Sequence, residues 1–292
     1  MSVATLRYEA SPPAAAIVPA ASLQRAHGEA ELVFGRRGAE TVLRHLHQRN
    51  PCRILFPDAD AGEPKLAVLL TTSGGLTGGD DIRIRVAMEA GAEGVVTTQA
   101  AEKLYRSLGP NTRIAVDLSI AADSWFEYLP QETILFDNAR LDRRTCVDVE
   151  KSGRFLGCEM VAFGRAAHGE AMTSGHLFDR WQVWRDGKLL WSDALLLDGD
   201  IAASLASPFQ FAGATAIATA IYVGPDAEDL LPVARELAQS TEHGGASLVG
   251  GVLVARFVDR SARVVRHDLM HYLMNLRHAA GRAAVLPRIW HS

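Results

Sequence analysis

The segment Asp81-Ile82-Arg83-Ile84-Arg85-Val86-Ala87-Met88 alternates charged or small residues with large apolar ones at a period of two. In an extended chain, this alternation places all four large apolar side chains on one face. The same pattern recurs in the segment that carries Ile114, Val116, Leu118 and Ile120. We therefore predict two half-buried β-strands whose apolar faces cover a common core.

Short segments with strand-like composition recur along the rest of the chain, and Gly, Pro, Asn or Asp lies near most of their boundaries. They predict further strands at Glu31–Phe34, Gly94–Thr98, Ser124–Leu129, Thr133–Phe136, Thr145–Val149, Phe155–Ala162 and Leu248–Phe257. Within Val183–Trp191, the pair Asp186-Gly187 lies where a two-residue hairpin turn requires positive φ at both positions. We predict a β-hairpin there.

A weak repeat relates Gly91, Ala122 and Gly153, which are 31 residues apart and fall in breaks between strand-like segments. The spacing favours a mainly β fold in which many short strands form stacked, solenoid-like sheets. Helices are predicted only toward the C-terminus, where Asp226 can cap a helix through about Gln239 and Ser261 can cap one through about Ala280. We predict a mobile arm over residues 1–28 and a single β-rich domain over residues 29–292.

Composition narrows the class of protein. The chain has 292 residues, of which 48% are hydrophobic and 22% charged, and no apolar run approaches the ~20 residues that cross a bilayer. Neither a membrane span nor a secretory signal is expected, so we predict a cytoplasmic protein. The net charge of −4 and the lack of basic runs argue against nucleic acid as a partner. Cys52, Cys146 and Cys158 form no C-x-x-C pair, which argues against a structural zinc site.

The densest glycine cluster, Thr72–Asp80, contains Gly74, Gly75, Gly78 and Gly79. A phosphate-binding P-loop needs Gly-Lys-Ser/Thr at the start of a helix, whereas here a strand follows and the loop has no lysine. The alternative is a turn between strands in which glycines occupy left-handed or crowded positions.

This loop and four later blocks together resemble the UreD (UreD/UreH) family of urease accessory proteins. The blocks are Ser73–Asp80, Thr97–Ser107, Glu127–Glu132, Phe163–Arg165 with Gly169-Glu170, and Leu286–Trp290. Their order and spacing extend the resemblance over roughly residues 30–292. The resemblance implies a β-rich, non-catalytic scaffold for urease maturation.

In that family picture, the protein forms a complex with UreF-like and UreG-like accessory proteins and docks on apo-urease. The UreG-like partner hydrolyses GTP, and a water-filled passage in the UreD-like subunit leads nickel toward the urease active site. The resemblance therefore implies no tightly bound cofactor and a nickel ion as transient cargo.

Divalent nickel accepts oxygen and nitrogen ligands, and a conduit should bind it weakly. The acids that the family pattern favours for the nickel path, or for an internal polar network with Arg165, are Asp80, Glu159 and Glu170. Ion pairing with Arg165, Arg106 or Lys103 explains the same acids equally well.

Other residues of the matching blocks are candidates for a structural or partner-contact role. They are the four loop glycines together with Lys103, Tyr105 and Arg106. On the predicted C-terminal helix, His267 and His271 are four residues apart, a spacing compatible with a metal site but also with a solvated helix face.

Two other function classes compete with the scaffold. One is a carbohydrate-active hydrolase on a β-solenoid, with Asp80 and Glu170 as paired acid and base. The chain shows no stripe of aromatic residues for stacking on sugars, which disfavours it. The other is a β-rich interaction module without metal involvement.

Overall fold

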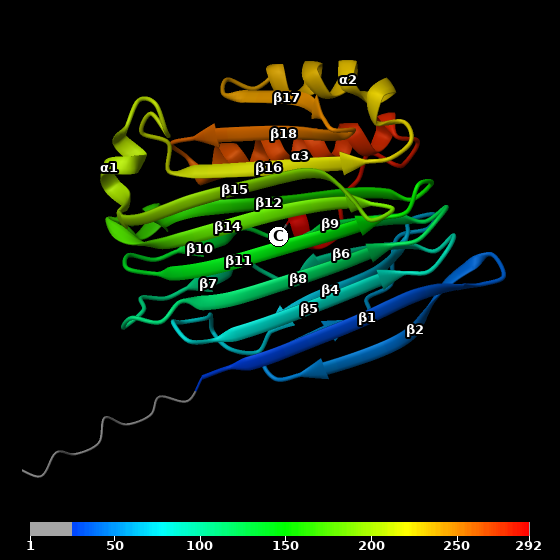
Figure 1. Ribbon diagram of the computed structural model, residues 1–292, viewed down its shortest axis with the longest axis horizontal. Helices are drawn as coiled ribbons and strands as arrows, with labels where there is room; N and C mark the ends of the chain where they lie inside the picture. Colours follow the sequence, from blue (N-terminus) through cyan, green and yellow to red (C-terminus); the bar gives the residue numbers. More distant parts are fainter. Residues whose placement is uncertain (1–24, 292) are drawn as a thin grey trace, which may run out of the picture.

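The computed structural model describes residues 25–291 and consists mainly of two stacked β-sheets (Figure 1). The alanine- and proline-rich part of the predicted arm, residues 1–24, lies outside the described residues. The seven-stranded sheet contains β1 (His27–Arg37), β2 (Glu40–Arg49), β5 (Asp81–Met88), β8 (Thr112–Ile120), β11 (Arg140–Val149), β14 (Ser174–Arg185) and β15 (Lys188–Asp200). Strand β1 starts at His27, which is inside the arm predicted for residues 1–28.

The eleven-stranded sheet faces the first sheet. Its main path contains β3 (Cys52–Leu55), β4 (Lys65–Thr71), β6 (Glu93–Thr98), β9 (Trp125–Leu129), β12 (Arg154–Arg165), β16 (Ala216–Val223), β17 (Gly244–Val249) and β18 (Val252–Asp259). Three short strands lie off this path, namely β7 (Glu102–Leu104), β10 (Thr133–Leu135) and β13 (Glu170–Ala171).

The chain winds between the sheets in successive coils, as in a solenoid. From β5 to β14, each coil places one strand in the seven-stranded sheet, one in the eleven-stranded sheet and one short strand before it returns. Equivalent strands of neighbouring coils pair in parallel, as β5 does with β8 and β6 with β9. The predicted stacked, solenoid-like β fold is confirmed.

The small residues of the weak repeat lie at stacked corners of these coils. The amide of Gly91 donates to the carbonyl of Ala122 at 3.0 Å. A Cβ atom on Gly153 would lie 2.9 Å from the carbonyl oxygen of Ala121. The interval of 31 residues therefore corresponds to one coil of the stack.

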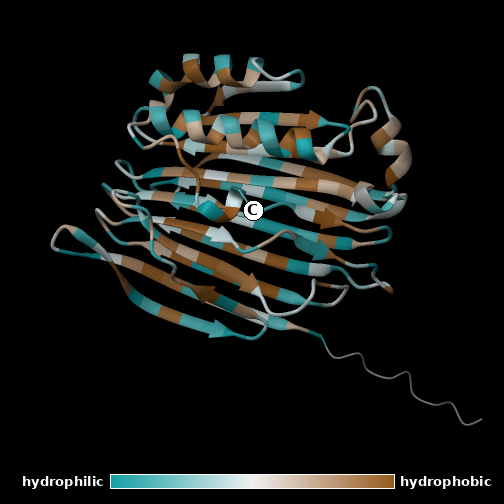
Figure 2. Ribbon diagram, turned by 180° about the vertical axis from the view of Figure 1, so that it is seen from behind, coloured by the Kyte–Doolittle hydropathy of each residue, from teal (hydrophilic) through white to brown (hydrophobic). Residues whose placement is uncertain are grey.

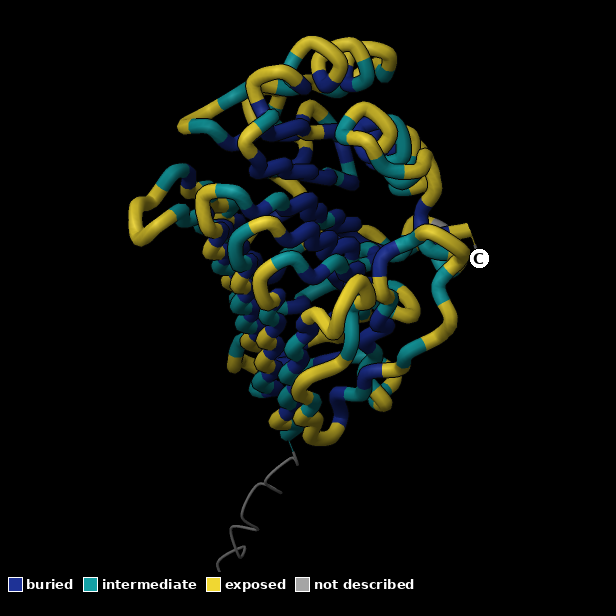
Figure 3. Tube along the Cα trace, turned by 90° about the vertical axis from the view of Figure 1, so that its right-hand side faces the viewer, coloured by how far each residue is buried: buried dark blue, intermediate teal, exposed yellow. Residues whose placement is uncertain are grey.

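Alternation along the strands fills the space between the sheets with apolar side chains, as the mixed colours of each strand show (Figure 2). The buried residues form a continuous layer between the sheets (Figure 3). A second core forms where helices α2 (Ala227–Gln239) and α3 (Ala262–Ala279) cover the other face of the eleven-stranded sheet. Both helices were predicted, and the short helices α1 (Ile201–Ala206), η1 (Ala166–His168) and η2 (Arg288–His291) were not.

Two local predictions need correction, and strand β2 was missed. The predicted strand Leu248–Phe257 is a hairpin of β17 and β18, because Gly250 and Gly251 both adopt positive φ and reverse the chain within an otherwise apolar run. Strand β2 was not predicted because its mostly exposed edge position imposes little alternation. Asp226 makes no capping hydrogen bond, since its carboxylate accepts the Tyr222 hydroxyl at 2.7 Å.

Two other local predictions hold. The Asp186-Gly187 hairpin turn joins β14 to β15, with φ of 50° and 76°. Ser261 caps α3 by accepting the amide of Val264 at 3.4 Å. Within the described chain, no helix is long and apolar enough to cross a membrane.

A buried ion pair fixes α3 to the sheet. The Arg277 Nε donates to Glu127 Oε1 on β9 at 2.9 Å, and Glu127 also accepts the indole N–H of Trp125 at 2.6 Å. Arg277 further bonds to Glu63 Oε2 at 2.6 Å and to the carbonyl oxygens of Ala283 and Val285. Burial raises the pKa of Glu127, and the guanidinium opposes that effect. The pair orients the helix because the fully buried Glu127 has Arg277 as its cationic partner.

We expect Arg277→Leu to lower the free energy of unfolding by about 3–5 kcal/mol, because it leaves Glu127 buried without its cation. Denaturant unfolding followed by circular dichroism measures the loss. Arg263→Leu, at an exposed position of the same helix, is the control and should change little. Adding Glu127→Leu to Arg277→Leu should recover most of the loss. A mild effect of Arg277→Leu alone would contradict this role.

Candidate functional site

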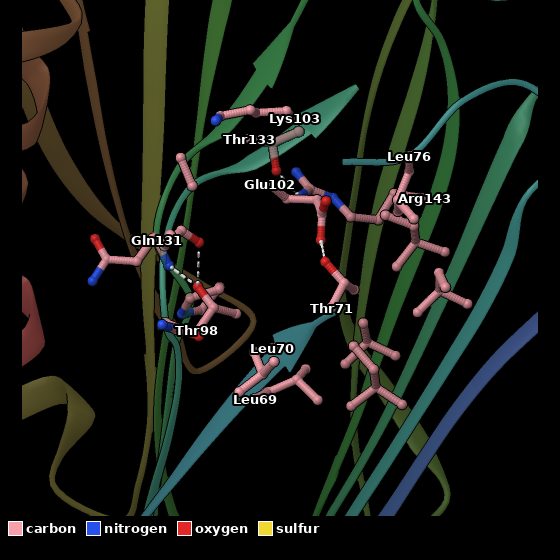
Figure 4. Close-up of a pocket in the computed structure, with 18 of the residues that line it drawn as sticks. Leu69, Leu70, Thr71, Leu76, Thr98, Glu102, Lys103, Gln131, Thr133 and Arg143 are labelled. Carbon is pink, nitrogen blue, oxygen red and sulfur yellow. Dashed lines mark hydrogen bonds between the residues drawn. The ribbon is translucent and has the colours of Figure 1, made fainter. Parts of the chain in front are cut away.

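A cavity of about 320 Å³ lies between the two sheets and is lined by strands of both (Figure 4). Its wall combines apolar strand residues with polar groups, among them Thr71, Glu102, Thr133, Arg143, Glu159 and Trp181. The glycine loop and the segment Gln99–Lys103 also line it. Three of the five matching sequence blocks, Ser73–Asp80, Thr97–Ser107 and Glu127–Glu132, therefore contribute to its wall.

Strand register explains why this part of the interior is polar. In the seven-stranded sheet, Ile82 pairs with Ile114, Ile114 with Arg143, and Arg143 with Asp179. This inward column thus changes from apolar to charged within one sheet. The apolar positions line one part of the cavity wall, and the charged positions need partners on an adjacent strand or on the facing sheet.

Arg143 is the centre of the charged network. Its guanidinium pairs with Asp179, lies 3.1 Å from Glu159 Oε2, and donates to Thr133 Oγ1 at 2.9 Å. Burial lowers the pKa of Arg143, but Asp179 and Glu159 outweigh that effect and raise it. The arginine therefore stays charged inside the protein.

Glu159 completes the network from the eleven-stranded sheet. Its carboxylate also accepts the indole N–H of Trp181. Burial and the nearby Asp179 raise the pKa of Glu159, while Arg143 opposes them. Of the three acids that the family pattern favours, Glu159 is the one that lines the cavity.

Glu102, on β7, is the second carboxylate of the cavity wall. It accepts the Thr71 hydroxyl at 3.2 Å, and the two side chains face each other in Figure 4. Burial raises the pKa of Glu102 from 4.5 to about 7, partly offset by the hydrogen bond from Thr71 and by the amide of Lys103. Sequence reasoning did not select this residue.

The glycine loop packs against the segment that follows β6 and forms part of the cavity wall. The Leu76 amide donates to the Lys103 carbonyl at 2.8 Å, and the Tyr105 hydroxyl donates to the Gly74 carbonyl at 2.7 Å. Gly75 has φ of +143°, and a Cβ there would lie 2.6 Å from the Lys103 carbonyl oxygen. The glycine therefore allows two backbone segments to approach closely. This is the turn that the sequence offered as the alternative to a phosphate site.

The other loop glycines and the remaining motif residues play similar structural parts. A Cβ on Gly78 would collide with Ser107, and Gly79 has φ of +93° against Arg25. The Thr77 hydroxyl donates to the Arg106 carbonyl at 3.0 Å. The Lys103 side chain extends away from Glu102 and Thr71 in Figure 4.

Asp80 closes the glycine loop and does not line the cavity. Its two carboxylate oxygens each accept a backbone amide at 2.8 Å, from Ala26 and from Thr77. Asp80 borders a separate, smaller hollow of about 210 Å³ with His27, Asn111 and Arg113 among its neighbours. The carboxylate thus holds the loop to the start of β1.

Glu170 and Arg165 form an ion pair outside the cavity, with 2.6 Å between Oε2 and Nε. The Arg165 guanidinium lies 4.2 Å from the centre of the Phe136 ring. Ion pairing, which the sequence left as an alternative, therefore accounts for Glu170. Asp80 and Glu170 share neither hollow, so the structure does not bring together the acid and base of the hydrolase hypothesis.

The two helix histidines lie on the surface of α3. His267 is 81% exposed beside Asp268, and His271 contacts Asn275. Over residues 25–291, no three or more His, Cys, Asp or Glu side chains come close enough together to hold a metal ion. Both histidines lie on a solvated face of the helix, and a metal site at this pair stays a prediction.

A further sequence block, Leu286–Trp290, contacts two of these blocks behind the cavity, on the face of the sheet that carries α3. The Trp290 indole N–H lies 3.2 Å from Thr97 Oγ1 and 3.3 Å from the Leu129 carbonyl. The Gln131 amide donates to the Ile289 carbonyl at 3.3 Å. The blocks that are distant in sequence thus form one continuous contact network.

Comparison with known proteins identifies the family of this chain. Residues 26–291 match the family model described as UreD urease accessory protein. The chain belongs to the UreD family. A protein of Magnetococcus marinus named urease accessory protein UreD is 40% identical over 99% of both chains. A namesake from Azorhizobium caulinodans is 41% identical over 91% of this chain and 97% of its own length. A third protein of that name, from Agrobacterium fabrum, is 39% identical over 91% of this chain and 92% of its own length.

The central members of the site, Glu102, Arg143 and Asp179, were not predicted. Arg143 had a detectable signal, because it occupies an inward position in the alternation of Leu141, Thr145 and Val147. A charged residue at such a position requires an internal partner. The identity of that partner depends on strand pairing, which the sequence does not display.

We expect Gly75→Ala to destabilise the protein by about 1–3 kcal/mol, because the new methyl group collides with the Lys103 backbone. Gly109→Ala is the matched control, since Gly109 has nearly the same φ of +144° but nothing within 4 Å of a Cβ. Thermal or urea unfolding of both variants separates crowding from backbone strain. Equal losses would show that the close approach at Gly75 contributes nothing.

We expect Glu102→Gln to alter the pH dependence of stability. In the wild type, the raised pKa of Glu102 means that the folded state binds more protons than the unfolded state between pH 4.5 and about 7. This contribution to the free energy of unfolding is largest below pH 4.5 and is lost as pH rises toward 7. Between pH 4.5 and pH 8, the free energy of unfolding of the variant should therefore rise relative to that of the wild type, on the order of 1–3 kcal/mol in all. Parallel stability curves would contradict the assignment.

Proposed function

We propose that this protein is a urease maturation factor that binds apo-urease and, with UreF-like and UreG-like partners, conducts nickel to the urease active site. The observation that carries the proposal is the UreD family match over residues 26–291. Relatives covering nearly the whole chain bear the name urease accessory protein. A role in urease maturation follows from the family, and nickel conduction is the specific role we propose.

The cavity is the candidate route for the ion. Its wall offers carboxylate and hydroxyl oxygens at Glu102, Glu159 and Thr71, which suit a divalent cation of intermediate hardness. A cation in this cavity meets few ligands at once, which favours passage over trapping. Strand residues of its wall such as Ile82, Val116 and Trp181 are buried, whereas Gln99 and Lys103 are exposed to solvent.

The division of labour with partners follows from what the chain contains. The sequence has no P-loop motif, so we assign GTP hydrolysis to the UreG-like partner. The protein then acts as a cytoplasmic scaffold rather than an enzyme, with nickel as transient cargo. The hydrolase alternative loses support because Asp80 and Glu170 are engaged at separate places.

The test replaces the native gene in cells that produce urease and measures urease nickel content and activity. We expect deletion to leave urease without nickel, and Ala101→Trp to reduce nickel loading several-fold because Ala101 lines the cavity and a large ring there narrows it. Ala202→Trp, at an exposed position of α1, is the control.

Each variant should still co-purify with the UreF-like partner and with apo-urease, which shows that assembly is intact. Fully nickel-loaded urease in the deletion strain would refute the maturation role. Normal loading by Ala101→Trp, with assembly intact, would refute the route through the cavity and favour an interaction module without metal involvement.

A further inference from the structure

Glu102 lacks the basic partner that three other interior carboxylates have. Asp80 also lacks one, but its carboxylate accepts two backbone amides outside the cavity. Glu127, Glu159 and Asp179 each pair with an arginine. No ion pair to Glu102 occurs within residues 25–291, and its side-chain partner is the neutral hydroxyl of Thr71. The cavity wall thus holds one carboxylate whose charge the described protein does not balance.

Leaving this carboxylate unpaired has an energetic cost. Burial of an ionised carboxylate without a counter-charge is unfavourable, and one hydroxyl together with the Lys103 amide compensates only in part. A bound cation would remove the remaining cost. The position is therefore poised to gain from a positive ion that enters the cavity.

The charged groups around Glu102 do not supply that positive charge. Asp80, from the glycine loop, adds negative potential and raises the pKa of Glu102, and the Cys52 thiol on β3 lies near enough for Glu102 to raise its pKa in turn. Arg143 is committed to Asp179, Glu159 and Thr133. The Lys103 side chain points away from Glu102 in Figure 4. The local field therefore favours a cation.

We propose that Glu102 is the principal ligand of a weak divalent-cation site in the cavity, completed by the Thr71 hydroxyl and water molecules. Divalent ions are commonly held by one or two carboxylates while they retain several waters, and such sites release the ion readily. The identity of the ion as nickel rests on the proposed function. The site itself rests on the unpaired carboxylate and its position in the cavity.

The test measures binding of NiCl₂ to the full-length protein by equilibrium dialysis. We expect Glu102→Gln, which keeps the shape and removes the charge, to weaken nickel binding by at least about tenfold. Thr71→Val should weaken it by a smaller factor. Glu170→Gln, which removes a carboxylate already paired with Arg165 outside the cavity, is the matched control and should bind as the wild type does.

Circular dichroism melting of each variant verifies that the fold is retained, and Thr71→Val provides an independent reading if Glu102→Gln folds poorly. Unchanged binding in folded Glu102→Gln overturns the site, as does a wild type that binds no nickel. If Glu102→Gln binds normally while deletion still abolishes urease activation, the site fails and the maturation role stands. If deletion leaves urease activation intact, the maturation role fails whatever the dialysis shows.

Discussion

Parallel, in-register pairing of successive coils is the constraint on which the rest of the molecule depends. It stacks each inward position of one coil on an inward position of the next, as Ile82, Ile114, Arg143 and Asp179 illustrate. Where the column is apolar, the sheets close on each other and form the core. Where it becomes charged, partners must come from an adjacent strand or from the facing sheet. The network of Arg143, Asp179 and Glu159 is the result.

The eleven-stranded sheet separates two kinds of interior. On β9, Tyr128 faces the cavity and its neighbour Glu127 faces α3. On the α3 side, the buried Glu127 pairs with Arg277, and loss of Arg277 would leave this carboxylate buried without its cation. On the cavity side, Glu102 keeps a carboxylate without such a partner. One sheet thus combines a rigid clamp on one face with an adaptable polar space on the other.

Sequence alone predicted the fold class, the corner positions Gly91, Ala122 and Gly153, and both long helices, because each depends on local periodicity or on turn and cap residues. It did not predict β2, an exposed edge strand that alternation does not constrain, or the turn at Gly250-Gly251, which interrupts an apolar run. The alternation of apolar and polar residues reveals a strand only where one face of that strand is buried.

The candidate site was predicted less well, since its members meet through strand pairing between residues far apart in sequence. Glu159 was selected and lines the cavity, whereas Asp80 and Glu170 belong to the same sequence blocks but serve a loop and a surface ion pair. Family blocks identified the right segments of the chain. They did not distinguish which acid in a segment faces inward, because that choice depends on coil register.

Coil register also fixes which side chains of each strand point inward and which point outward. Deleting one residue ahead of Arg143 on β11 would turn its guanidinium toward water and point a neighbouring outward side chain at Glu159 and Trp181. An insertion or deletion at a coil corner does not change which side chains of the strands point inward. Natural insertions and deletions in such a chain should therefore accumulate at the corners, and the strands should vary by substitution alone.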